Sequence, residues 1–235
     1  MTAGVSPTAS PAVAPVEAVA STGRPRSWGW VLRWALVAGL LALLLRMFVV
    51  QSFVIPSSSM DPTLRVGDRV VVSRWHHDLH RGDVVVFDGT GVFAAANPPA
   101  RNVLVAAGRG LGSVLGLPIG RHDYVKRVVG LPRDHVVCCD ANGRLSVNGV
   151  LAPEPYLQPG VPPSLTPFDV RVPADRLWVM GDNRGDSADS RAHLGDPGGG
   201  MVPVANVVGP VLAVWWPLGQ ARAVAAADPL GAGGR

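Results

Sequence analysis

Residues 123–132 read D-Y-V-K-R-V-V-G-L-P, and this run indicates the structural class of the whole chain. Its valines and tyrosine favour a strand, and the closing Gly-Leu-Pro is typical of a turn. Lys126 is the only lysine among the 21 Lys and Arg residues. Arginine keeps its charge at any ordinary pH, whereas a desolvated lysine can act as a neutral base. Lys126 is therefore a candidate general base, unless an arginine-rich composition left one lysine by chance.

Strand-like runs of similar length follow one another after residue 50, separated by Gly, Pro, Asp and Asn. They are 69–73, 84–87, 124–129, 135–138, 144–147, 170–172, 177–180 and 207–214. No amphipathic helix of normal length interrupts them, so we expect a mainly β domain with a folded antiparallel sheet or barrel-like core. Residues 88–121 are rich in Gly and Ala without periodicity, which indicates an inserted excursion.

The first 50 residues divide into a polar tail and an apolar segment. Residues 1–27 hold few large apolar side chains, so we expect a disordered tail. Residues 28–50 are apolar, and a helix of that length would span about 34 Å, which is enough for a transmembrane anchor. Three arginines precede the apolar core and one follows it closely, so the tail is expected in the cytoplasm and the rest outside. A cleaved signal peptide is the alternative, but no small-x-small cleavage site follows.

The remaining chain is expected to form an extracytoplasmic domain over 51–217 and a loosely ordered tail over 218–235. The formal net charge is +4 and the pI about 9.8. The arginines are scattered and no nucleic-acid-binding motif accompanies them, so contact with anionic lipid is the simpler use of the charge. An oxidising outer compartment would permit a bridge between Cys138 and Cys139, although such a ring is strained. The preferred interpretation is that they face opposite sides of a strand.

A candidate nucleophile lies where the apolar segment meets the domain. Residues 55–64 read I-P-S-S-S-M-D-P-T-L. Three serines between prolines are often only a turn, so this segment alone does not identify a nucleophile and the rest of the chain has to be considered.

Three segments occur in order after the apolar segment: P-S-S-S-M-D-P-T-L from Pro56, the Lys126 run, and G-D-N-R-G-D-S-A-D-S-R from Gly181. Together they resemble the bacterial type I signal peptidases, membrane-bound Ser/Lys proteases that remove signal peptides from exported proteins. The resemblance covers about residues 28–217. It implies that Ser59 is the nucleophile and Lys126 the general base. It also implies that the Ser57 hydroxyl and the Ser59 backbone N–H bind the oxyanion.

The resemblance further implies supporting residues and a substrate pocket. Ser187 would hydrogen-bond and orient the lysine, while Asp189 and Arg191 would support the site. Family members accept small side chains at positions −1 and −3, and the matching pocket positions are Ile55, Pro56, Tyr124 and Val125. Residues 185–186 depart from the pattern, because Gly-Asp stands where the family more often has Asp-Asn.

The chemistry of such a pair depends on the pKa of the amine. At a pKa of about 10.4 only about one lysine in 2,500 is neutral at pH 7. Lowering the pKa by about three units requires about 4 kcal/mol, which burial and the Arg127 charge could supply. The neutral amine could then take the Ser59 proton and pass it to the leaving amine.

Other functions make different demands on the sequence. A histidine base is the main competitor, with His193 closest to the third motif. A membrane-tethered binding module would need neither Ser59 nor Lys126, and a self-cleaving Ser/Lys regulator would need a DNA-binding head. The loop after Asp182 lacks the ligand spacing of a calcium site. We therefore expect no cofactor, no metal and no nucleic acid, and as partners exported preproteins and the lipid bilayer.

Overall fold

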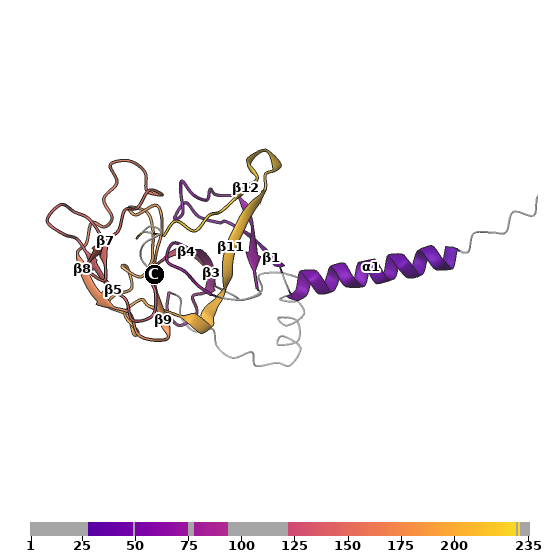
Figure 1. The fold of residues 1–235 in the computed structure, drawn as a ribbon, viewed down its shortest axis with the longest axis horizontal. Coiled ribbons are helices and arrows are strands. Elements are labelled where there is room, and N and C mark those ends of the chain that lie inside the picture. Colours follow the sequence, from indigo (N-terminus) through magenta and orange to yellow (C-terminus); the bar gives the residue numbers. More distant parts are fainter. Residues whose placement is uncertain (1–27, 49, 75–77, 94–121, 229, 231–235) are drawn as a thin grey trace, which may run out of the picture. The chain divides into compact units, whose positions relative to one another are not determined.

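The computed structural model describes residues 28–48, 50–74, 78–93, 122–228 and 230, and Figure 1 shows the elements they form. The chain divides into two units, with the boundary between Leu40 and Leu41, and each is described by itself. The tail expected over 1–27 and most of the excursion expected over 88–121 lie outside the described residues.

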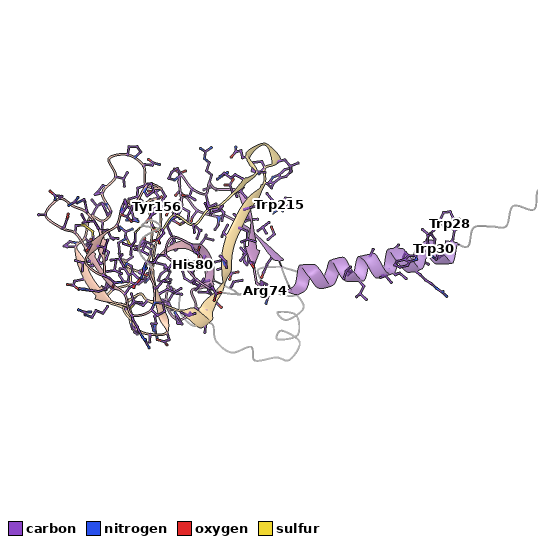
Figure 2. The ribbon with its side chains drawn as sticks, in the orientation of Figure 1. Trp28, Trp30, Arg74, His80, Tyr156 and Trp215 are labelled. Atoms are coloured by element: carbon purple, nitrogen blue, oxygen red, sulfur yellow. A yellow bond between two sulfur atoms is a disulfide. The ribbon has the colours of Figure 1, made fainter. Side chains whose placement is uncertain are left out.

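The apolar segment forms one helix, α1 (Trp28–Phe48). Its described side chains, from Trp28 to Leu41, are exposed, and Trp28 and Trp30 project from it in Figure 2. Within the described part of the chain, no helix combines the length and apolar character that a membrane crossing requires. The helix is thus confirmed, but its transmembrane character is not.

The described strands after residue 49 form two antiparallel sheets, which confirms the mainly β class. The larger sheet has the order β1 (Val50–Val54), β2 (Arg69–Ser73), β11 (Val207–Trp216), β3 (Val84–Asp88), β4 (Asp123–Gly130), β9 (Arg176–Met180) and β10 (Val202–Pro203), with β12 (Arg222–Ala223) paired to β11. The smaller sheet has the order β7 (Val150–Leu151), β6 (Ser146–Val147), β5 (His135–Cys138) and β8 (Phe168–Arg171). Two 3₁₀ turns complete the elements, η1 (Val204–Asn206) and η2 (Leu218–Gln220).

Strand β4 lies in the middle of the larger sheet, between β3 and β9. Its last five residues are buried, so both of its faces are covered there. Gly130 ends the strand where the two sheets meet, because a Cβ at this position would lie 2.7 Å from Val136 of β5. The glycine therefore allows β4 to pack directly against the smaller sheet.

The expected strands are found with small shifts at their ends. The exception is 144–147, which contracts to β6 because Arg144 closes a turn with Asp140, whose backbone N–H donates to the Arg144 carbonyl over 2.9 Å. Strand β1 was not expected, because its sequence reads as the end of the apolar segment. It pairs along its whole length with β2, from Val50 opposite Ser73 to Val54 opposite Arg69.

The expectation for the two cysteines is wrong, because Cys138 and Cys139 form a disulfide. Strand β5 ends at Cys138, so Cys139 is outside the strand and the alternation of faces no longer applies to it.

Part of the segment after residue 217 contacts the domain where the structure describes it. Strand β12 pairs with β11, and the Ala227 N–H donates to the Gly82 carbonyl over 3.3 Å. Gly82 has a φ of +85°, and a Cβ there would lie 2.2 Å from the Ala227 carbonyl oxygen. This close backbone contact holds the segment against the domain.

Candidate active site

Ser59 lies in a tight turn that follows β1. Ile55, Met60 and Leu64 are buried on either side of it, and the Leu64 N–H donates to the Met60 carbonyl over 2.9 Å. These apolar anchors fix the turn from below, so the side chain of Ser59 has little freedom. Ser59 itself is only 8% exposed.

Lys126 reaches Ser59 from the centre of β4. Its side chain is 3% exposed, and Nζ lies 2.5 Å from the Oγ of Ser59, although 67 residues separate the two in sequence. Because a strand holds its side chains in a fixed direction, the amine is oriented by the sheet rather than by a loop. The structure therefore brings together the two residues that the sequence motifs single out.

The pKa of Lys126 is lowered from 10.5 to about 8, mainly because burial disfavours the charged amine. Asp189 and Asp182 act against this and Arg191 reinforces it. At pH 7 about one amine in ten is then neutral, compared with about one in 2,500 for an exposed lysine. Burial thus makes Lys126 a usable base near neutral pH.

The expected role of Arg127 in lowering this pKa is not found. Arg127 lies on the other face of β4 and forms two buried hydrogen bonds with Asp182, from Nε over 2.8 Å and from the terminal nitrogen over 2.6 Å. Its charge is therefore compensated locally. The arginine that lowers the Lys126 pKa is Arg191 from the third motif.

The third motif approaches the nucleophile through Gly181. A Cβ on Gly181 would lie 2.4 Å from the carbonyl oxygen of Ser59, so only glycine allows this approach. The Asn183 N–H donates to the same carbonyl over 3.1 Å. At the unusual Gly185-Asp186 pair, Asp186 accepts a hydrogen bond of 2.7 Å from Ser58. Asp186 thus links the third motif to the turn that carries Ser59.

Asp189 and Arg191 form the expected supporting pair. Arg191 donates to both carboxylate oxygens of Asp189, over 2.9 and 2.8 Å, and the Gly181 N–H donates to Asp189 over 2.9 Å. Burial alone would raise the pKa of Asp189, but the hydrogen bonds and charge of Arg191 outweigh it and the pKa is lowered. Asp189 therefore stays ionised and fixes the start of the motif.

The other two serines lie where the motifs place them, with one difference. The Ser57 Oγ donates to the Ser59 Oγ over 3.3 Å, next to the site of attack. The Ser187 Oγ is buried and forms no hydrogen bond with Lys126. It meets no partner at hydrogen-bonding geometry, although it is near enough to Asp189 to help lower the pKa of that carboxyl. The expected contact to the lysine is thus absent here.

The expected pocket positions do not all belong to one apolar cluster. Ile55 and Val125 pack in the cluster below the nucleophile turn, whereas Tyr124 packs against Phe87 in another and Pro56 is exposed. A pocket wall shared by all four stays a prediction.

His193, the competing candidate for the base, contacts Asp196 and Phe93. Its Nδ1 lies 2.7 Å from Asp196, and its ring stacks on Phe93 with the centroids 4.6 Å apart. The hydroxyl of Ser59 meets Lys126 instead.

Sequence reasoning missed one buried ion pair near the site, which is separate from the pairs Arg127–Asp182 and Arg191–Asp189. Arg184 of the third motif pairs with Glu154, and both side chains are almost fully buried. Tyr156, labelled in Figure 2, lies against the Arg127 guanidinium with 4.1 Å from the ring centroid to Cζ. Glu154 and Tyr156 lie in a loop without a motif, so the sequence held no signal for them.

Comparison with known proteins finds the family that the three motifs resemble. The family model described as signal peptidase, peptidase S26, matches residues 27–216. Signal peptidase I of Mycobacterium tuberculosis (strain H37Rv) is 38% identical over 220 residues, covering 83% of this chain and 74% of that protein. The probable signal peptidase I of Mycobacterium leprae is 36% identical over 237 residues, covering 86% and 81%. Signal peptidase I of Pseudomonas aeruginosa is 35% identical over 210 residues, covering 75% and 69%. The chain therefore belongs to the signal peptidase family of S26 peptidases and is a hydrolase of the serine protease class.

Proposed function

We propose that this protein removes N-terminal signal peptides from exported preproteins, with Ser59 as nucleophile and Lys126 as general base. The observation that carries the proposal is the 2.5 Å contact between the Lys126 amine and the Ser59 hydroxyl. Such contact between a nucleophile and a group of lowered pKa is the arrangement that activates a serine.

Acylation would begin from the neutral amine. Lys126 accepts the Ser59 proton while Oγ attacks the scissile carbonyl, and it then donates that proton to the leaving amine. The negative charge on the carbonyl oxygen needs donors, and the Ser57 hydroxyl with the Ser59 backbone N–H are the proposed pair. The Ser57 hydroxyl, 3.3 Å from the Ser59 Oγ, lies at a suitable place for this role.

Deacylation would use the same base a second time. Once the amine has passed its proton to the leaving group it is neutral again and can take a proton from water. That water attacks the ester carbonyl of the acyl-enzyme, the protonated amine returns its proton to the departing Ser59 Oγ, and the signal peptide is released as a free acid. One buried lysine can serve both steps because each ends with the amine neutral.

The substrate class rests on the family and on the small apolar surroundings of the site. Shallow pockets near Ile55 and Val125 would accept small side chains at positions −1 and −3 of the signal peptide. Large side chains at these positions would have to displace the buried cluster below the turn, which is costly in a packed interior.

Attachment to a lipid bilayer is the second part of the proposal. It rests on the family and on the exposed apolar side chains of α1. The N-terminus would lie in the cytoplasm and the peptidase domain on the extracytoplasmic face. Fractionation of cells that express the whole chain tests this, and recovery in the soluble fraction would contradict it.

The test of the chemistry is cleavage of a signal peptide with an A-x-A site, followed by mass spectrometry in detergent. We expect the intact chain to cut after the second alanine and both Ser59→Ala and Lys126→Ala to lose activity. Ser146→Ala on β6 is the matched control for a serine substitution and should cleave normally.

Each other outcome has a definite meaning. Equal cleavage by Lys126→Ala and the intact chain would place the base elsewhere, and His193→Ala would then be the next variant to assay. If the intact chain cuts no such peptide, the binding-module alternative takes precedence.

A further inference from the structure

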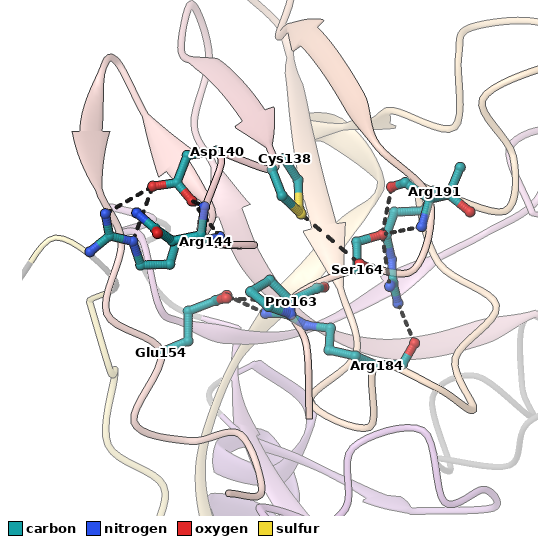
Figure 3. The surroundings of a disulfide bond; sticks show 11 residues. Cys138, Asp140, Arg144, Glu154, Pro163, Ser164, Arg184 and Arg191 are labelled. Atoms are coloured by element: carbon teal, nitrogen blue, oxygen red, sulfur yellow. Dashed lines mark hydrogen bonds and ion pairs between the residues drawn. A yellow bond between two sulfur atoms is a disulfide. The ribbon is translucent and has the colours of Figure 1, made fainter. Parts of the chain in front are cut away.

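The loop between β7 and β8 meets the third motif through a buried ion pair. Arg184 contacts both carboxylate oxygens of Glu154, and its second terminal nitrogen also donates to the Pro163 carbonyl over 2.8 Å (Figure 3). The two side chains are 1% and 3% exposed. A buried charge without a partner is costly, so each of these groups depends on the other.

Tyr156 strengthens this arrangement from the same loop. Its hydroxyl donates to Glu154 over 2.9 Å, and burial raises its pKa far above the ordinary range, so it remains a donor. The Cζ of Arg127 lies 4.1 Å and that of Arg184 5.9 Å from the ring centroid. The ring therefore attracts both guanidinium groups.

The ion pair is connected to the nucleophile by two hydrogen bonds. The Arg184 Nε donates to the Gly181 carbonyl over 2.9 Å. Asn183, which lies between Gly181 and Arg184 in the sequence, donates its backbone N–H to the Ser59 carbonyl over 3.1 Å. A guanidinium fixed by Glu154 thus holds the loop that sets the position of Ser59.

We propose that Glu154 is a positioning residue for the Ser59 nucleophile, acting through Arg184. This inference rests on the proposed function. Without the Glu154 charge, Arg184 is drawn toward Asp182, the other carboxylate whose charge acts on it, and that carboxylate already pairs with Arg127. The loop then shifts and Ser59 leaves its position against the lysine.

The expected signature is kinetic. Misplacement of a reacting atom lowers the rate of the chemical step, by on the order of 10- to 100-fold for a shift of about 1 Å. Binding of the peptide does not use Glu154, so KM should change by less than about twofold while kcat falls.

The experiment compares three variants with the intact chain. Glu154→Gln keeps the shape but removes the charge, and Glu154→Asp keeps the charge. The pair Glu154→Met with Arg184→Met removes both charges and fills the space, so it should keep the fold. Measurements are the thermal midpoint, kcat and KM for the A-x-A peptide, and the rate at which a fluorophosphonate labels Ser59.

Glu154→Gln should fold, lose kcat and label slowly, while Glu154→Asp should recover part of both rates. The paired Met variant should have a near-normal midpoint but a low kcat, because the bond to Gly181 is gone. A normal kcat in the folded paired variant would overturn the proposal, since the ion pair would then be merely structural.

Labelling separates this proposal from the proposed function. If the intact chain labels at Ser59 but cuts no signal peptide, the substrate is wrong and the labelling rates still decide the role of Glu154. Equal labelling of the intact chain and Glu154→Gln, including no labelling of either, overturns the positioning role.

Discussion

Replacing the candidate base by an apolar side chain should make the protein more stable at neutral pH. The pKa of Lys126 is lowered from 10.5 to about 8, chiefly by burial, so the folded protein binds this proton less tightly than the unfolded chain does. The gap between the two pKa values corresponds to about 3 kcal/mol at pH 7. Lys126→Met fills a similar space without a charge and avoids this cost.

The difference in unfolding free energy between Lys126→Met and the intact protein depends on pH in a defined direction. Below pH 8 both the folded and the unfolded chain carry the proton, and the full cost of the buried charge is present. Between about pH 8 and 10.5 the folded protein has lost the proton while the unfolded chain still holds it, so the cost fades as the pH rises. The excess stability of Lys126→Met should therefore be largest at pH 7 and lower by about 2 to 3 kcal/mol at pH 10.

Urea unfolding followed by tryptophan fluorescence, at pH 7 and at pH 10 in the same detergent, measures this difference. Ser59→Ala is the control, because it removes the hydroxyl and leaves the amine able to titrate. Lys126→Met should also be inactive at both pH values. An excess stability that is the same at pH 7 and pH 10 would refute the reasoning, because the amine would then have an ordinary pKa.

The remaining predictions concern activity. The kcat/KM of the intact protein should rise about tenfold per pH unit from pH 6 and level off around the Lys126 pKa of about 8, as a pH profile with the A-x-A peptide will show. Asp186→Asn keeps an acceptor for its serine partner but removes a charge that raises the Lys126 pKa, so the midpoint of that profile should move to lower pH. Gly181→Ala should lower kcat by on the order of 100-fold, because its Cβ displaces the carbonyl of the nucleophile; a single-turnover assay checks this.

The sequence was sufficient to single out Ser59 and Lys126, which the structure brings into contact, because each motif carries its chemistry locally. A lone lysine in a strand and a serine in a tight turn can be recognised without knowing how they meet. The β-rich class was likewise predictable, since strand-like runs and turn residues alternate along the chain. What joins Ser59 to Lys126 is the central position of β4 in the larger sheet, and the resemblance supplied that pairing.

The surroundings of the dyad could not be predicted, because they depend on which faces and loops meet in space. Predicting that Arg191, and not Arg127, lowers the pKa of the amine required knowing where the third motif lies relative to Lys126. Glu154 lies in a loop without periodicity or motif, and its partner Arg184 is 30 residues away. The disulfide was missed because the end of β5 at Cys138 was not visible in the sequence.

The charges around Lys126 explain why its pKa falls although carboxylates lie near it. Asp189 and Asp182 both favour the charged amine, but each is bound by its own guanidinium, from Arg191 and Arg127. With these pairs compensated, the amine is the one cation in the described part of the site without a carboxylate in direct contact, and desolvation decides its pKa. A variant that left Asp189 without Arg191 would present an unpaired carboxylate to the amine, raise the pKa of Lys126 and reduce the neutral fraction at pH 7. The two arginine pairs thus help to keep the pKa of Lys126 low, in addition to holding the loops in place.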